Sequence, residues 1–153
     1  MSMNNERNPQ IESIYVGSQA SGVSLSVPGL YFRKRSRIKN VWIVDQAGVN
    51  ATGNTTDYFA FTLQDNSATP IAYAAFTTSG TSLAALTQSA AFTLKNGGGQ
   101  AFDATPGLDS DSATQLEVDV PAGTMLNLNI VGTTSAQHKV LTNMSALIEW
   151  YPL

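Results

Sequence analysis

The segment from Gln115 to Ile130, QLEVDVPAGTMLNLNI, decides the fold class of this chain. Apolar and polar residues alternate on both sides of a central Pro-Ala-Gly turn. The apolar positions are Leu116, Val118, Val120, Leu126, Leu128 and Ile130. A period of two residues places them on one face of each strand. The segment therefore predicts a β-hairpin with one dry face, which reverses at Pro121-Ala122-Gly123.

The same alternation recurs along the rest of the chain, cut by Gly, Pro, Asn and Asp. Further strands are predicted over residues 14–16, 23–27, 36–45, 58–65, 71–77, 92–94 and 140–150. Pro28-Gly29 is expected to end the second of these by turning the chain. Leu83 to Leu86, rich in Ala and Leu, predicts one helical turn.

Several positions within these strands are assigned to a face by their spacing. In the strand over residues 36–45, Ile38 is expected to share a face with Trp42 and Val44. Phe59, Phe61 and Leu63 are expected to face inward, and Met144, Ala146, Ile148 and Trp150 are expected to share one face of the last strand. The last strand nearly reaches the C-terminus, which ties that end into a sheet.

Eight or nine short strands with frequent turn signals predict an all-β protein. Long connections between them favour a jelly-roll-like antiparallel β-sandwich of about eight strands. A length of 153 residues suits one domain with a single core. We expect that domain over residues 14–153, preceded by a flexible polar arm over residues 1–13.

Composition excludes several classes of site. The chain has no cysteine, so disulfides, thiol nucleophiles and cysteine metal sites are excluded. The polar start predicts no cleaved export signal, and no apolar run reaches the ~20 residues of a membrane helix. We expect a protein that has no membrane association and no cofactor.

Basic residues concentrate in one short segment, although the chain carries a net charge of −3. Five of the eight Lys and Arg residues lie there: Arg33, Lys34, Arg35, Arg37 and Lys39. A local patch that opposes the global charge favours docking on an acidic surface. The alternative is an edge strand that uses charge to prevent sheet-to-sheet aggregation.

Catalytic and metal-binding patterns are weak. His138 is the only histidine and lacks a Gly-x-Ser-x-Gly partner motif. Asp109-Ser110-Asp111 starts like a calcium loop but lacks the later glycine and glutamate. Glu117 and Asp119 share one wet strand face, which is typical of a surface rather than of paired catalytic carboxylates. We therefore expect no enzyme and no bound metal.

Aromatic residues beside basic ones are typical of nucleic-acid-binding proteins, and Tyr31 and Phe32 adjoin the basic segment. The net charge is negative, however, and the sequence shows no set of aromatic residues on which bases could stack. We therefore expect no nucleic-acid partner.

Three segments resemble the small jelly-roll structural proteins of tailed bacteriophages, and within that group the capsid decoration, or cement, proteins. They are residues 35–45 (RSRIKNVWIVD), 57–63 (DYFAFTL) and 120–128 (VPAGTMLNL), which lie between a polar N-terminal arm and a final strand. The resemblance covers most of residues 14–153 and lies in pattern, without a diagnostic motif.

The resemblance implies a non-enzymatic virion protein that binds the outer surface of the head as a homotrimer. It would stabilise the shell by bridging subunits of the major capsid protein, after synthesis in the host cytoplasm. Capsid contacts are expected from Arg7 and from Arg33, Lys34, Arg35, Arg37 and Lys39. These cations would meet acidic capsid groups, or the acidic 103–119 region of a neighbouring subunit.

Two other functions stay open. One is a phage tail or receptor-binding β-sandwich domain that recognises host-surface carbohydrate through exposed aromatic residues such as Tyr31, Tyr73 or Tyr151. The other is a small β-sandwich enzyme or a non-viral trimeric ligand, for which the sequence offers no defined active site.

Overall fold

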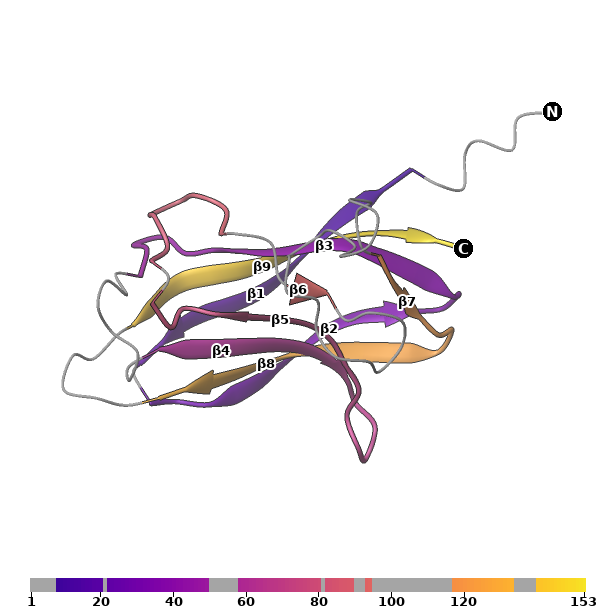
Figure 1. Ribbon diagram of the computed structural model, residues 1–153, viewed down its shortest axis with the longest axis horizontal. Coiled ribbons are helices and arrows are strands. Elements are labelled where there is room, and N and C mark those ends of the chain that lie inside the picture. The colour runs from indigo at the N-terminus through magenta and orange to yellow at the C-terminus, as the bar shows by residue number, and fades with distance from the viewer. Residues whose placement is uncertain are drawn as a thin grey trace.

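Alternating apolar side chains from two facing sheets form the interior of the protein. The computed structural model describes residues 8–20, 22–49, 58–80, 82–89, 93–94, 117–133 and 140–153. Figure 1 shows the two sheets stacked as layers. All the strand pairs are antiparallel. The expected all-β sandwich is therefore confirmed.

Nine strands occur in the described part of the chain. The four-stranded sheet has the order β1 (Gln10–Gln19), β9 (Leu141–Pro152), β3 (Ser36–Val44) and β7 (Val118–Val120). The five-stranded sheet has the order β2 (Leu25–Phe32), β8 (Thr124–Gly132), β4 (Phe59–Asp65), β5 (Ala72–Thr77) and β6 (Thr93–Leu94).

This strand order is that of a jelly roll with one short strand added at an edge. The first strand pairs with the last, and β2 pairs with β8 in the opposite sheet. Successive strands therefore cross repeatedly between the sheets, as two interlocked Greek keys require.

Both sheets bury the positions that the sequence pattern selected. Fully buried side chains with large volumes include Phe59, Phe61, Leu63, Leu126, Leu128, Ile130 and Met144. The tilted ring pair Phe59–Phe61 has its centroids 6.3 Å apart. The Trp150 ring is perpendicular to that of buried Phe32, with the ring centroids 5.0 Å apart, so Trp150 packs against the core.

The predicted hairpin around Pro121 is wrong in its pairing, although its buried faces are right. β7 pairs with β3, whereas β8 pairs with β2 and β4, so the two strands belong to different sheets. The dry faces of both sheets line the same core in a sandwich. The alternation is therefore identical whether the turn joins neighbours or crosses between layers.

A bulge in β3 changes which side chains enter the core. The register with β9 shifts between Ile38 and Asn40, so Lys39 is the extra residue. Ile38 consequently shares the buried face with Val41 and Ile43, not with Trp42 as expected.

The first strand is longer than expected. β1 begins at Gln10 rather than Ile14, and Gln10 is paired with Trp150. Residues 10–13, which were assigned to the arm, are thus part of the sheet. Residues 1–7 lie outside the described residues.

Pro28-Gly29 does not end its strand, which continues to Phe32 through a register shift opposite β8. A Cβ atom at Gly29 would lie 2.5 Å from Ile14 Cδ1 and 2.7 Å from the Leu126 carbonyl oxygen. Glycine at this position therefore allows β2 to approach the core closely. The same Pro-Gly pair, taken without the tertiary contacts, is indistinguishable from a turn.

The predicted helical turn at residues 83–86 is also wrong. Leu83 forms an antiparallel bridge with Val49. The Leu86 N–H donates to the Asp45 carbonyl at 2.9 Å. The backbone of this segment thus bonds to the chain at and beyond the end of β3, and these tertiary bonds override local helix propensity.

Gly29→Ala should lower the free energy of unfolding by about 1–3 kcal/mol, because the added methyl group overpacks the contact with Ile14 and Leu126. Ser26→Ala, on the exposed face of the same strand, is the control. Urea denaturation measures both. Equal midpoints for the two variants would show that the close approach is not needed.

Candidate functional site

The basic segment lies at the β2–β3 connection and along β3. Arg33, Lys34 and Arg35 are exposed between the two strands, whereas Arg37 and Lys39 lie half-buried in β3. The connection therefore presents cations to solvent, and the strand holds cations against the sheet.

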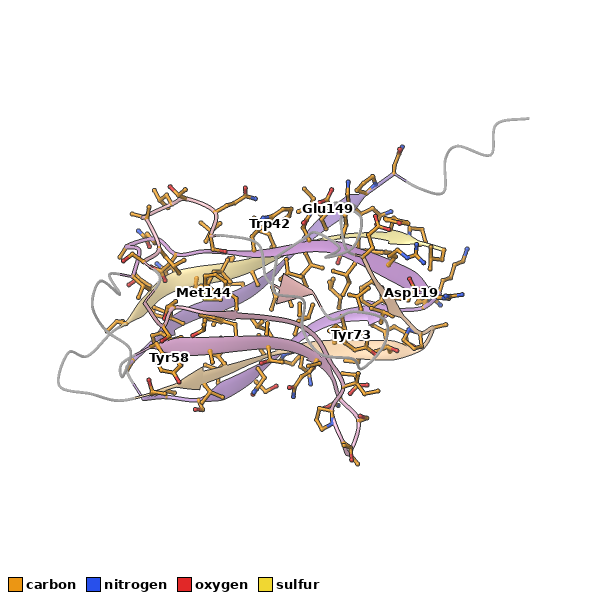
Figure 2. All side chains as sticks on the ribbon, viewed as in Figure 1. Trp42, Tyr58, Tyr73, Asp119, Met144 and Glu149 are labelled. Carbon is orange, nitrogen blue, oxygen red and sulfur yellow. The ribbon has the colours of Figure 1, made fainter. Side chains whose placement is uncertain are left out.

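Arg37 is the centre of an ion-pair cluster on the outer face of the four-stranded sheet. Its Nε donates to Asp119 Oδ1, and Nη2 of Arg35 donates to Asp119 Oδ2. Arg37 Nη1 lies 3.6 Å from Glu117 Oε2. The Tyr151 hydroxyl donates to that same Glu117 oxygen. Figure 2 shows Asp119 at the end of the sandwich near β7.

Strand register explains why these groups meet. Arg37 is directly opposite Asp119 on β7 and Tyr151 on β9. Opposite residues on one face have Cβ atoms ~4.5–5.5 Å apart, within reach of long side chains. The cluster is thus fixed by backbone pairing of three strands.

A second pair lies farther along the same face. Lys39 Nζ is 3.8 Å from Glu149 Oε1, and Asn40 Nδ2 donates to Glu149 Oε2 at 2.6 Å. The β3 bulge allows both Lys39 and Asn40 to reach this one carboxylate, because the two residues oppose a single stretch of β9.

The cluster shifts the acidity of its members. The hydrogen bond from Arg37 is the main cause that lowers the pKa of Asp119, with a further contribution from Arg35. The hydrogen bond to Asp119 likewise raises the pKa of Arg37. Burial and then the bond to Glu117 raise the pKa of Tyr151, although Arg37 opposes this. The charged forms of Arg37 and Asp119 therefore stabilise each other.

The expected docking patch consequently divides into two parts. Arg35, Arg37 and Lys39 are paired with this chain's own carboxylates. Arg33 and Lys34 have no ion pair within the part of the chain that the structure describes, and both are exposed. Arg7 and residues 103–116 lie outside that part.

The candidate aromatic residues have different surroundings. Tyr73 is 3% exposed and belongs to the core, and burial raises its pKa. Tyr151 is half-buried in the ion-pair cluster. Tyr31, in contrast, is 57% exposed. Of the three, only Tyr31 presents most of its ring to a ligand.

The other candidates from the sequence, His138, Asp109 and Asp111, lie outside the described residues. Within the described ranges, no group of three or more His, Cys, Asp or Glu side chains is close enough to hold a metal ion. The same ranges contain no helix long and apolar enough to cross a membrane.

A recess that the sequence did not single out lies at the β4–β5 loop. Its volume is about 360 Å³, and its lining is Asp65, Asn66, Ser67, Gly123, Thr124 and Met125. Asp65-Asn66-Ser67 has the composition of a turn, so the sequence by itself predicts only a turn here. The strand that completes the recess is about sixty residues away in the sequence, so no local signal joins the two.

Comparisons with known proteins assign no family. No protein-family model matches the chain, and no curated protein matches it. A chain in the structure of infectious bursal disease virus, Gx strain, is similar over 97% of this chain at 12% identity and a TM-score of 0.31. The match spans 37% of that viral chain. At this score, the likeness assigns no function.

Asp119→Asn should reduce the dependence of stability on acid pH. The pKa of Asp119 is lower in the folded protein, so its ionisation stabilises the fold above the unfolded pKa of ~3.9. That contribution is lost as pH falls through the folded pKa. Urea unfolding at several pH values between ~6 and ~2 should therefore show a smaller loss of stability for Asp119→Asn than for the native protein.

Glu12→Gln is the matched control, because Glu12 is an exposed carboxylate in β1 with no salt bridge to another described residue. A parallel pH dependence for the native protein and Asp119→Asn would contradict the stabilising role of the cluster.

Proposed function

We propose that this chain is a non-enzymatic virion structural protein, a decoration protein that binds the outside of a tailed-phage head as a homotrimer. Its role would be to bridge major capsid protein subunits and so stabilise the shell. Assembly onto the head would follow synthesis in the host cytoplasm.

The observation that carries the proposal is the jelly-roll strand order, an architecture found in viral capsid and lectin domains. The segments behind the phage resemblance fall on strands of both sheets. Residues 35–45 include β3, residues 59–63 lie in β4, and residues 120–128 run from the end of β7 into β8. The resemblance therefore concerns the sandwich itself.

The basic β2–β3 connection supports contact with an acidic capsid surface. Arg33 and Lys34 are exposed and lack ion pairs within the described structure, so docking them requires no existing bridge to break. Arg35 keeps a largely exposed side chain even while it bonds to Asp119. Exposed charges of this kind steer association and give it salt dependence.

The outer edge of β1 supports self-association. β1 ends the four-stranded sheet, so its other edge has no strand partner within the described residues. Ile11 and Tyr15, on the face of this strand opposite buried Ile14, are 64% and 65% exposed. Register shifts distort the strand only after Tyr15, which leaves the stretch from Gln10 to Tyr15 regular. A regular edge with apolar side chains favours pairing with another chain.

A closed trimer would convert three weak capsid contacts into one strong attachment. Once one subunit binds, the others meet their sites at a high effective concentration. This mechanism needs neither catalysis nor a cofactor. A few exposed cations per subunit are enough, because the three subunits bind together.

Purified protein should co-sediment with undecorated phage heads, and salt should release it. Raising the salt from ~0.1 M to ~1 M shortens the Debye length from ~10 Å to ~3 Å, which weakens exposed ionic contacts. Arg33→Gln/Lys34→Gln should reduce the pelleted fraction severalfold at low salt. Lys95→Gln/Lys139→Gln removes the same charge elsewhere in the sequence and is the control.

Binding that ignores salt, or equal loss in both double variants, would contradict docking through this connection. A protein that fails to pellet with heads under any condition would contradict the decoration function and favour the tail or receptor-binding alternative.

Light scattering should give a mass three times that of the 16.2 kDa chain. Ile11→Asp should lower it toward the monomer, because three carboxylates would be brought into or near the contact. Val131→Asp is the control, since Val131 is an exposed aliphatic residue on the other sheet. A monomeric native protein, or a trimer disrupted only by Val131→Asp, would contradict self-association through β1.

A further inference from the structure

We infer that the recess at the β4–β5 loop is a binding site for a neutral saccharide. The inference goes beyond the proposed decoration function and does not depend on it. The protruding loop is visible in Figure 1, where the chain between β4 and β5 projects away from the five-stranded sheet.

Asp65 builds one wall of the site. Its Oδ1 accepts hydrogen bonds from the Ile71 N–H at 2.9 Å and from the Ser67 hydroxyl at 2.8 Å. A longer bond of 3.3 Å comes from the Ser67 N–H. Burial opposes ionisation, but these bonds outweigh it and lower the pKa of Asp65. The loop is thus held around an ionised carboxylate.

The second oxygen of this carboxylate remains available to a ligand. Within the described residues, none of the hydrogen bonds to the Asp65 side chain uses Oδ2. The adjacent Asn66 accepts at Oδ1 from Asn127 Nδ2 at 3.2 Å, which fixes its amide against β8. Its own Nδ2 has no hydrogen-bond partner in the same part of the structure.

A carboxylate acceptor beside an amide donor matches the chemistry of sugar hydroxyls. Each hydroxyl can donate one hydrogen bond and accept others, so neighbouring hydroxyls can donate to Asp65 Oδ2 and accept from Asn66 Nδ2. The hydroxyl of Thr124, which also lines the recess, provides a third polar group. A small number of polar groups that converge in a concave site is typical of small-molecule binding.

An exposed aromatic ring lies next to the recess. Met125 lines it, and Tyr31 is directly opposite Met125 in the β2–β8 pairing. Both side chains are exposed, at 57% for Tyr31 and 38% for Met125. Residues opposite each other on one face are neighbours, with Cβ atoms ~4.5–5.5 Å apart. The Tyr31 ring can therefore pack on the apolar C–H face of a sugar held by the loop.

The charge and size of the recess narrow the ligand class. The lining carries one carboxylate and no cation, which disfavours acidic sugars. A metal ion is disfavoured because hard cations take six or more oxygen ligands and no acidic cluster occurs among the described residues. A volume of about 360 Å³ is at the small end of ligand sites, so we expect one neutral sugar unit rather than a long chain.

Saturation-transfer NMR with the native protein tests the site directly. The probes are D-glucose, D-galactose, D-mannose and N-acetyl-D-glucosamine, and the same protein is applied to an array of neutral and acidic oligosaccharides. At least one neutral sugar should receive saturation, and acidic sugars should bind less well. If the protein binds oligosaccharides on the array but no free sugar, the inference holds only if Tyr31→Ala and Asp65→Asn weaken that array binding.

Tyr31→Ala should weaken binding about fivefold to tenfold through loss of ring packing. Asp65→Asn should weaken it about tenfold or more, because an amide replaces the charged acceptor while Oδ1 can still hold the loop. Protection of the Ile71 amide from hydrogen exchange reports whether that loop is intact. Tyr58→Ala, directly before β4 and at the end of that strand opposite the recess, is the control and should bind normally.

Two results would overturn the inference. One is the absence of binding by the native protein to every sugar and oligosaccharide. The other is sugar binding that Tyr31→Ala leaves unchanged, which would place the site elsewhere; Tyr31 makes no hydrogen bond to another described residue, so its loss leaves the loop intact.

Discussion

The burial of two alternating apolar faces against each other is the constraint on which the rest of this structure depends. β9 is central to it, because it pairs with β1 on one side and β3 on the other. Met144, Ala146 and Ile148 from β9 are all fully buried. With no disulfides available, this packing must supply most of the stability. The surface features considered for binding are all positioned by it.

Local departures from regular strand geometry adapt the sandwich to that constraint. The bulge at Lys39 returns Ile38 to the core and turns Lys39 and Asn40 toward Glu149. A second irregularity in β2 accompanies the close approach at Gly29. Asp45, fully buried at the end of β3, accepts a hydrogen bond from the Thr142 N–H at 2.7 Å. The β3 bulge thus brings Lys39 and Asn40 to a carboxylate partner, and the buried Asp45 carboxylate is satisfied by a backbone donor.

Charge and apolar surface are separated over the molecule. The Arg37 cluster neutralises much of the basic segment within the chain, so the exposed cations are concentrated at the β2–β3 connection. The exposed apolar edge of β1 and the recess at the β4–β5 loop belong to different sheets. The proposed subunit contact at β1 therefore lies on the opposite sheet from the proposed sugar site, whereas Tyr31 of that site is two residues before Arg33 of the proposed capsid contact.

The sequence by itself determined the fold class and most of the core, because a period of two shows directly which side chains share a face. Phe59, Phe61 and Leu63 are buried as that period predicts. The tertiary structure alone decided which strands pair, since the alternation around Pro121 suits a hairpin and a crossing between sheets equally well. It alone also decided the partners of Arg37 and the recess beside Tyr31. Those groups come from strands distant in sequence, and only backbone pairing brings them together.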